Sequence, residues 1–307
     1  MRKRGWHEKA IELKKKGLSN YEIARQVFGK SSKESTLRYF FNHPSVAAQV
    51  KQINKAKILY WDIEIAPFLS FHWDKWGVNI GNGQHLTEKF MLSHSWAWND
   101  GEIEGSVLTS EEARAQNDER IVTEAWQLLD EADILIAHNG RSFDVKMINA
   151  FFLRHGFPPP SPYKVIDTYR IAKRKFKLTS SSLAYLAKFL GVTQKLDSGG
   201  MESFIKAYQG DEDALREMLV YNNGDIDTLR QVYHKLKSWD NDGVNMGVYS
   251  EHSAVCANCG SDNISVIENK FQFTNVSAFH LVRCGECQAV SRFRKSTKLD
   301  VNITRTT

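Results

Sequence analysis

Two acidic residues in an apolar run are spaced so that they could bind a divalent cation together. The segment 57–67, K-I-L-Y-W-D-I-E-I-A-P, is rich in strand-forming residues and is interrupted by Asp62 and Glu64. Residues two apart on a strand point to the same face, so the two carboxylates would lie side by side and repel each other. A divalent cation between them would remove that repulsion. An edge strand with two solvated acids is the alternative interpretation.

Two later stretches carry groups that could join this pair. The segment 132–144, A-D-I-L-I-A-H-N-G-R-S-F-D, predicts a short buried strand followed at once by a helix, with Asp144 in the first turn of that helix. This position lies at the carboxyl end of a strand, where α/β folds usually keep their chemistry. Tyr221 and Asp225 are four residues apart in a predicted helix and therefore share one helix face.

Taken in order, the motifs D-I-E, N-x-x-x-F-D and Y-x-x-x-D resemble those of the DnaQ-like (DEDD) 3′→5′ exonuclease superfamily, which has a ribonuclease-H-like fold. The tyrosine of the third motif makes the chain most similar to the proofreading domains of DNA polymerases and to related stand-alone exonucleases. The histidine form of that motif would need a histidine where this chain has Val220. The resemblance covers about residues 57–237, and the ordered set of three motifs is far more specific than any one of them.

The resemblance implies a role for each residue that matches a motif. The carboxylates would hold two Mg²⁺ or Mn²⁺ ions, the hard cations that carboxylate oxygens prefer, and Asp62 would bridge the two ions. Tyr221 would orient the attacking water or help to deprotonate it. The implied metal ligands are Asp62, Glu64, Asp144 and Asp225, and together with Tyr221 they form the implied catalytic set.

The resemblance also implies side chains that hold the end of a nucleic acid. Asn139 and Phe143 match positions of the second motif that contact the terminal nucleotides. Phe68, followed by Phe71 and Trp73, could stack on the 3′ end, because single strands are commonly held on aromatic faces. Ordinary core packing of these aromatic residues is the alternative. We expect structural rather than metal-binding roles for three other acids: Asp133, Asp167 and Asp227.

The elements expected to position these residues form an α/β domain over residues 57–237, with a ribonuclease-H-like mixed sheet flanked by helices. Its meander of antiparallel strands precedes a strand-then-helix order, which indicates a layered α/β architecture. The predicted strands of the meander cover residues 71–78, 91–98 and 103–108, and the predicted helices cover about residues 111–131, 143–155, 181–190 and 213–236.

Residues 1–43 predict a small helical domain. The stretch L-K-K-K-G-L-S-N-Y-E-I-A-R-Q-V-F-G resembles the helix-turn-helix family, in which a support helix precedes a recognition helix. The recognition helix would cover about residues 32–42 and offer Lys33 and Arg38 to DNA. A generic helical cap is the alternative. Polar stretches on either side of the α/β domain read as linkers, at residues 44–56 and 238–254.

All four cysteines fall in two C-x-x-C pairs near the end of the chain, within a segment 255–307 that resembles a zinc ribbon. Four thiolates suit tetrahedral Zn²⁺, and the metal would supply stability that so small a core cannot. Two disulfides are the alternative. Basic residues near the pairs, among them Arg292 and Arg294, favour contact with phosphates. The expected zinc ligands are Cys256, Cys259, Cys284 and Cys287.

Composition and charge limit the remaining possibilities. The chain of 307 residues carries a net charge of +5, which permits nucleic-acid binding without requiring it. Its apolar runs are all shorter than the roughly 18 residues that a membrane span needs, and its basic start leads into a charged segment instead of an apolar signal sequence. We therefore expect no membrane partner and a cytoplasmic location, in the nucleoid or in the host cytoplasm if the source is viral. The sequence carries no signal that separates monomer from dimer.

These observations predict a metal-dependent 3′→5′ exonuclease that removes nucleotides from the 3′ ends of nucleic acid by two-metal-ion hydrolysis. DNA is favoured over RNA as the partner because of the helix-turn-helix resemblance, and a replication or repair complex is a candidate assembly. The alternative is a non-catalytic or regulatory DNA-binding protein that uses the nuclease fold as a scaffold.

Overall fold

The structure, a computed structural model, describes residues 5–15, 20–41, 56–192, 200–240, 243–250, 254–275 and 277–297. Residues 44–55 of the predicted first linker and the part of the predicted ribbon beyond residue 297 lie outside the described residues. The chain divides into two compact units. One comprises residues 1–55 with 247–255, and the other comprises residues 56–246 with 256–307. Each unit is described by itself below.

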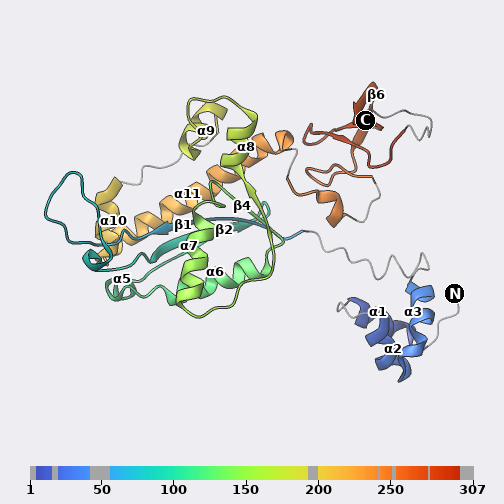
Figure 1. The fold of residues 1–307 in the computed structure, drawn as a ribbon, viewed down its shortest axis with the longest axis horizontal. Helices are drawn as coiled ribbons and strands as arrows, with labels where there is room; N and C mark the ends of the chain where they lie inside the picture. Colours follow the sequence, from blue (N-terminus) through green and yellow to red (C-terminus); the bar gives the residue numbers. More distant parts are fainter. Residues whose placement is uncertain are drawn as a thin grey trace. The chain divides into compact units, whose positions relative to one another are not determined.

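The larger unit is built on a five-stranded mixed sheet with helices on both faces (Figure 1). The first three strands in the sheet order pair antiparallel, whereas the last three run parallel to one another. This arrangement confirms the predicted α/β class with a mixed sheet. The strand order is β3 (Ile103–Val107), β2 (Met91–Trp98), β1 (Ile58–Ile65), β4 (Ile134–Ala137) and β5 (Lys164–Asp167).

The described helices of this unit agree with the pattern of the sequence in two places. The predicted helix that ends at Gly191 is capped at its start by Ser182, whose side chain accepts a hydrogen bond from the Tyr185 N–H. The long helix predicted over residues 213–236 is also present, as α11. In chain order the helices are α5 (Ser110–Ala115), α6 (Glu119–Glu131), α7 (Asp144–Arg154), α8 (Thr168–Lys175), α9 (Leu183–Leu190), α10 (Gly200–Tyr208) and α11 (Glu212–Leu236), with 3₁₀ turns η2 (Asn82–Gln84) and η3 (Lys237–Trp239). The 3₁₀ turn η4 (Met246–Tyr249) begins in this unit and belongs to the smaller unit from residue 247 on.

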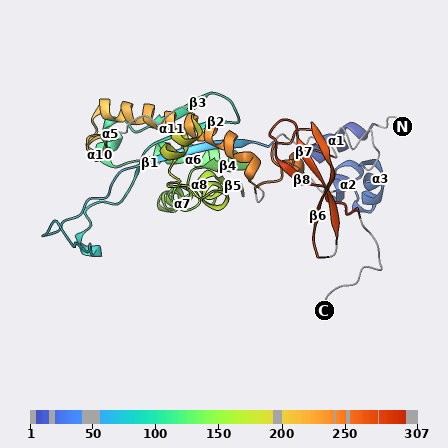
Figure 2. The ribbon, with the colours of Figure 1, turned by 90° about the horizontal axis from the view of Figure 1, so that it is seen from above.

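The alternation of side chains along β1 divides the strand between two helical layers. Leu59, Trp61 and Ile63 are buried in the main core together with apolar residues of α6 and α7. The intervening residues point to the other face of the sheet. That face is covered by α11, where the rings of Tyr60 and Tyr233 lie 6.1 Å apart. Figure 2 shows α7 and α11 on opposite sides of the sheet.

The single helix predicted over residues 111–131 is wrong, because the structure has two helices, α5 and α6, in this stretch. Gln116 adopts the left-handed region with a φ of 54°, which ends α5. Asp118 is fully buried and accepts hydrogen bonds from Arg154 at 2.6 Å and His155 at 2.7 Å. The chain therefore breaks where a carboxylate binds side chains that are distant in sequence, and an apolar pattern does not show such a contact.

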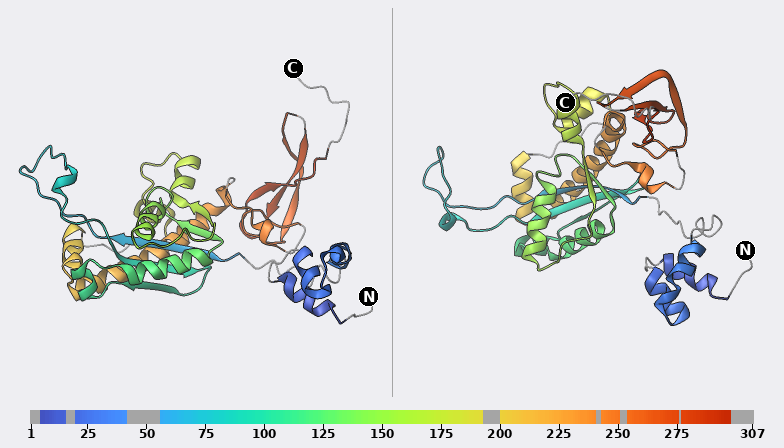
Figure 3. Two further views of the ribbon diagram at one scale, coloured as in Figure 1. Left: turned by 60° about the horizontal axis from the view of Figure 1, so that its bottom comes forward. Right: turned by 45° about the vertical axis from the view of Figure 1, so that its right-hand side comes forward.

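The strand predicted over residues 71–78 is also wrong. Residues 66–90 form a long loop, here called the β1–β2 arm, which extends away from the sheet in both views of Figure 3. An isolated bridge between Ser70 and His85 joins its two sides. Trp73 is 100% exposed and Gly77 turns the chain with a φ of 67°. The aromatic run thus turns back at a glycine instead of continuing as a strand.

The C-terminal part of the larger unit is a three-stranded antiparallel sheet, here called the cysteine module. Its strands are β6 (Ile264–Phe273), β7 (Ala278–Cys284) and β8 (Val290–Arg292), in that order. One buried cluster consists of Cys256, Cys284 and Ala289, and Ala278 and Val282 of β7 are also buried. The Asn258 side-chain amide donates to the carbonyl oxygens of Lys237 at 2.6 Å and Asp240 at 2.9 Å, so the module is bonded to the chain that follows α11.

The smaller unit is helical in its described part. The predicted recognition helix over residues 32–42 corresponds to a 3₁₀ turn followed by an α-helix. Trp6 packs edge-on against Phe28 and Phe40, with ring centroids 4.9 and 4.8 Å apart. Its elements are α1 (His7–Lys15), α2 (Asn20–Phe28), η1 (Ser31–Lys33) and α3 (Glu34–Phe41), and its buried apolar residues are Ala10, Ile23, Ala24, Leu37 and Phe40. None of the helices in the described ranges of either unit is long and apolar enough to span a membrane.

Candidate active site

Three acidic side chains from two different elements meet near the carboxyl end of β1. Asp62 and Glu64 lie on the face of β1 that α11 covers, as the alternation predicts, and Asp225 comes from α11 itself. One carboxylate oxygen of each of these three residues lies within 4.8 Å of the others. Like charges this close repel, and a shared cation would offset that repulsion. The three oxygens therefore fit the donor set of a hard divalent ion.

Helix α11 is fixed against the sheet by contacts that also orient Asp62. The Asn222 side-chain amide donates to Asp62 Oδ2 at 2.7 Å, and Ser95 Oγ of β2 donates to Asn223 Oδ1 at 2.7 Å. The helix approaches closely at Gly105 of β3, where an added Cβ would lie 2.6 Å from Asn223 Oδ1 and 2.7 Å from Ser95 Oγ. A side chain at this position would displace the Asn223 and Ser95 side chains from their present positions.

Asp144 contributes the fourth carboxylate from the first turn of α7. It is buried, and burial raises its pKa to about 7, with a further contribution from the negative charge of Asp167, while backbone N–H groups of Asp144 and Ile63 act in the opposite direction. A cation beside Asp144 would favour its ionised form at neutral pH. Asp144 lines the same cleft as Asp62, Glu64 and Asp225.

Asp167 has the structural role that the sequence predicts for it. Its carboxylate accepts hydrogen bonds from the backbone N–H groups of Asn139 at 2.9 Å and Arg141 at 3.3 Å, and it caps α8 through the Arg170 N–H at 3.3 Å. Asn139 adopts a φ of 63°, a left-handed conformation that asparagine tolerates better than most residues. The end of β5 therefore holds the loop that leads from β4 to Asp144.

An open cleft of about 430 Å³ brings the acids and the second-motif residues together. Phe143 stands in its wall with 45% of its surface exposed, where a planar ligand could stack on it. The described residues that line the cleft are Asp62, Ile63, Glu64, His138, Asn139, Phe143, Asp144, Tyr169, Ser182, Leu183, Ala184 and Asp225.

Two candidates from the sequence lie outside this lining. Tyr221 is buried one helical turn before Asp225 on α11. Phe68 lies at the base of the β1–β2 arm, stacked on His85 with ring centroids 5.1 Å apart. Phe71 and Trp73 lie further along the arm, and their exposures of 71% and 100% rule out the alternative that these two are core residues.

Sequence reasoning missed Asn222, which is fully buried and bonded to Asp62. Ser93 Oγ of β2 lies 3.4 Å from Asn222 Oδ1 on the other side of the same amide. The available signal was the pair Asn222 and Asn223 in the interior of a long helix, where asparagine has low helix propensity. A buried amide in such a position needs hydrogen-bond partners, and here they include a catalytic candidate.

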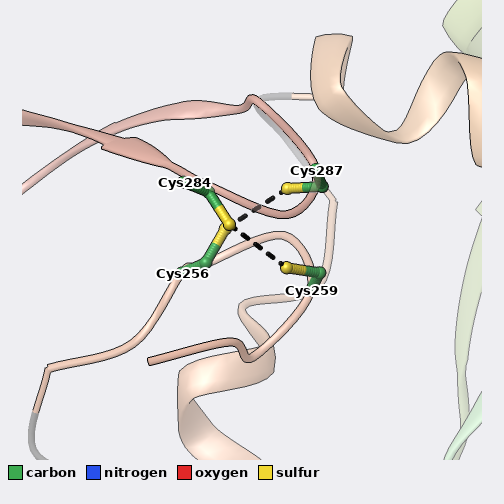
Figure 4. Close-up of side chains that lie close together, drawn as sticks. All are labelled: Cys256, Cys259, Cys284 and Cys287. Carbon is green, nitrogen blue, oxygen red and sulfur yellow. Dashed lines mark hydrogen bonds between the residues drawn. The ribbon is translucent and has the colours of Figure 1, made fainter. Parts of the chain in front are cut away.

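The four cysteines form a second candidate metal centre (Figure 4). The Sγ atoms of Cys256 and Cys287 lie 3.5 Å apart, and those of Cys259 and Cys284 lie 3.6 Å apart. None of the four is in a disulfide. Zinc–sulfur bonds of about 2.3 Å in a tetrahedron would separate the sulfurs by about 3.8 Å, so the cluster has the size of a zinc site.

The basic residues predicted to contact nucleic acid lie on the surfaces of both units. Arg38 is exposed on α3 and forms an ion pair with Glu34 at 3.0 Å, and Lys33 is exposed in η1. Arg292 of β8 lies over the ring of Phe279 at 4.0 Å, and Arg294 is exposed shortly after it.

Comparison with known families agrees with this fold. The chain belongs to the RNase H superfamily, whose family model matches residues 84–237. Among solved structures, the chain is similar to the family B DNA polymerase from the hyperthermophilic archaeon Pyrobaculum calidifontis, with 14% sequence identity and a TM-score of 0.44. The match covers 63% of this chain and 27% of the polymerase chain, so this chain spans only a minor part of that protein. No curated protein sequence matches the chain.

Proposed function

We propose that this chain is a metal-dependent 3′→5′ exonuclease that hydrolyses the terminal phosphodiester bond of nucleic acid, with DNA favoured over RNA. The observation that carries the proposal is the meeting of Asp62, Glu64 and Asp225 oxygens within 4.8 Å, in an open cleft that Asp144 also lines. The order of the three motifs supports the 3′→5′ direction. Membership of the RNase H superfamily supports a nuclease.

The donor set fits two Mg²⁺ or Mn²⁺ ions, held by Asp62, Glu64, Asp225 and Asp144. Carboxylate oxygens are the ligands these hard cations prefer, and the ions would supply charge stabilisation to the attacking and leaving oxygens at phosphorus. The protein's own contribution is to hold the carboxylates in place. Asn222 fixes one oxygen of Asp62, and the hydrogen bonds of Asp167 hold the loop before Asp144.

The remaining side chains of the cleft suit the end of a strand. Phe143 offers an exposed ring for stacking against a terminal base, and Asn139 lines the same wall. Tyr221 is assigned to the orientation of the attacking water from its place one turn before Asp225. A phenol with an ordinary pKa near 10 is a weak base, so its role is positional.

The flanking parts of the chain are proposed to bind metal and nucleic acid. The cysteine module would hold one structural Zn²⁺, because its four sulfurs lie at distances that suit a tetrahedral ion. The helices within residues 1–43 would act as a helix-turn-helix-like DNA contact. The α/β domain over residues 57–237 would carry the hydrolysis.

The test is a digestion of 3′-labelled and 5′-labelled single-stranded DNA and RNA with Mg²⁺ or Mn²⁺. We expect early release of the 3′ label as mononucleotide and progressive shortening of the 5′-labelled strand. Asp62→Ala should abolish both. Asp227→Asn is the matched control, because Asp227 lies on the same helix but bonds Arg230 at 3.3 Å and Gln231 at 2.7 Å instead of lining the cleft. Intact substrates with retained DNA binding would favour a regulatory DNA-binding protein instead.

A further inference from the structure

A second groove, of about 1330 Å³, lies where the cysteine module meets the chain after α11. It is here called the module groove. One wall comes from strands β6, β7 and β8, and the other comes from η3 and the end of α8. The residues used below are Lys175, Trp239, Phe271, Arg283, Arg292 and Arg294.

Hydrogen bonds and an ion pair join these two walls, although the walls are distant in sequence. Asn258 donates to two backbone carbonyls around η3, and the Met246 N–H donates to the Ala257 carbonyl at 2.7 Å. Arg174 of α8 forms an ion pair with Asp240 at 3.0 Å, which ties α8 to the same segment. These contacts therefore hold the two walls of the groove together within the larger unit.

The charge of the module groove is positive. Lys175, Arg283, Arg292 and Arg294 line it, and none of the lining residues in the described part of the chain is Asp or Glu. Four cations in one groove without an acid favour a polyanion, because each can replace a counterion on a phosphate. An ordinary solvated protein surface mixes charges of both signs.

Aromatic rings stand among these cations. Trp239 is 55% exposed, and Phe271 is 37% exposed on β6. The Arg292 guanidinium already lies over the Phe279 ring, which leaves a flat cationic surface. Alternating rings and cations are the composition of grooves that bind single strands, where bases stack and phosphates pair with arginine. A duplex would keep its bases stacked inside and could not use the rings.

Helix α8 connects the module groove with the active-site cleft. Tyr169 at its start lines the cleft, and Lys175 at its end lines the groove. Six residues of helix span about 9 Å. Arg170 and Lys173 lie between them with exposed side chains, and Lys173 Nζ is 5.8 Å from the Tyr169 ring centroid. The helix thus forms a basic path between the two sites.

We propose that the module groove binds single-stranded nucleic acid upstream of the 3′ end that occupies the cleft. The inference rests on the proposed function for the identity of the cleft and adds a distal site that the substrate must be long enough to reach. Short strands would occupy the cleft alone, whereas longer strands would follow α8 and gain the contacts of the groove.

The experiment measures binding by fluorescence anisotropy, using the full chain with Asp225→Asn in magnesium-free buffer so that the probe stays intact. The probes are oligothymidines of about 20 and about four nucleotides. We expect tighter binding of the longer probe. Adding Arg292→Gln and Arg294→Gln should remove two phosphate contacts, which lowers the slope of log affinity against log salt by about 1.4 and weakens binding about 25-fold at about 0.1 M salt.

Two further variants separate charge from stacking and from misfolding. Trp239→Leu should weaken binding of the longer probe while the salt slope stays unchanged, because stacking releases no counterions. Lys270→Gln removes one positive charge from an exposed part of β6 outside the groove lining and should bind like the parent. Unchanged thermal unfolding of each variant shows that its fold is intact.

Several outcomes would overturn the inference. These are equal affinity for both probe lengths, an equal loss in the Lys270→Gln control, duplex DNA bound as tightly as the single strand, or a polyglutamate peptide bound more tightly than either. An oligouridine of equal length distinguishes RNA from DNA as the bound strand. A chain that binds as expected but does not hydrolyse contradicts only the proposed function, and a chain that hydrolyses without using the groove contradicts only this inference.

Discussion

The acidic cleft and the cysteine cluster are two candidate metal centres that relate to the surrounding hydrophobic core in opposite ways. The acids are attached to a large core: β1 alternates between Trp61, buried among apolar neighbours, and Asp62, which faces α11. The cysteines instead form most of their own core, since two of the three buried residues of that cluster are Cys256 and Cys284. The first centre is open to a cleft of about 430 Å³, whereas the second has four ligands at tetrahedral spacing.

The difference shows that a metal site can stabilise a fold or can be held in place by a fold that is already stable. A protein that buries a core such as that around Trp61 needs no ion to fold, so its acids are free to form a reactive centre. A module with cysteines in most of one buried cluster would depend on a bound metal for its stability. Four variants test this contrast, from the largest expected effect to the smallest.

The largest effect is expected for Cys256→Ser. Structural zinc contributes about 10 kcal/mol or more of folding free energy in small zinc modules, so loss of one ligand should unfold the cysteine module. Hydrogen exchange should show lost protection across β6 and β7, with β1 and β4 still protected as the internal control. Protection of β6 and β7 that survives both this variant and zinc chelation would contradict a metal-dependent core.

The acidic cleft should respond in the opposite way. Asp225→Asn should reduce nuclease turnover about 10³-fold, because several kcal/mol of charge stabilisation depend on the ligand set. Its thermal stability without metal should stay the same or rise, since one of several neighbouring negative charges is removed. A large loss of stability in this variant would show that Asp225 supports the fold, and Asp227→Asn on the same helix serves as the matched control.

Asp118 sharpens the comparison, because it is a fully buried acid whose hydrogen-bond donors all come from the protein. It accepts from Arg154 and His155, and also from the Met91 N–H at 2.8 Å. Asp118→Ala should lower the free energy of unfolding by about 3 kcal/mol, because the Arg154 guanidinium, the His155 ring and the Met91 N–H lose their buried acceptor. Urea unfolding measures the loss, and the activity of the remaining folded protein should be close to that of the wild type.

Asn222→Ala is expected to have the smallest effect. Removing the amide that holds Asp62 Oδ2 should weaken Mn²⁺ binding about 10-fold, as is typical for groups that orient a metal ligand. The Mn²⁺ concentration for half-maximal activity should rise, and saturating Mn²⁺ should restore most of the turnover. A loss of turnover that Mn²⁺ cannot restore would assign Asn222 a role other than positioning Asp62.

Sequence reasoning succeeds here where the decisive contacts are local. The face shared by Asp62 and Glu64 follows from the two-residue period of a strand, and the end of α9 follows from Gly191. Both depend on a few neighbouring residues. The same reasoning leads to the layered α/β class, whereas the ribonuclease-H-like fold is implied by the resemblance of the three ordered motifs.

It fails where a contact joins distant parts of the chain. The break before α6 exists because Asp118 bonds side chains 36 and 37 residues away, and the contact of Asn222 with Asp62 spans 160 residues. Within the β1–β2 arm, residues 71–78 are predicted as a strand because aromatic residues favour strands. Strand propensity describes a fit to a half-buried surface, and Trp73 is fully exposed.

The alternation along β1 also couples correct folding to correct assembly of the acid pair. A slip of one residue in the pairing of β1 with β4 would move Asp62 and Glu64 into the apolar layer and expel Trp61 from it. The misregistered chain would therefore be unstable as well as inactive. Because a misregistered chain would not stay folded, the folded population and the population with a correctly assembled acid pair should be the same.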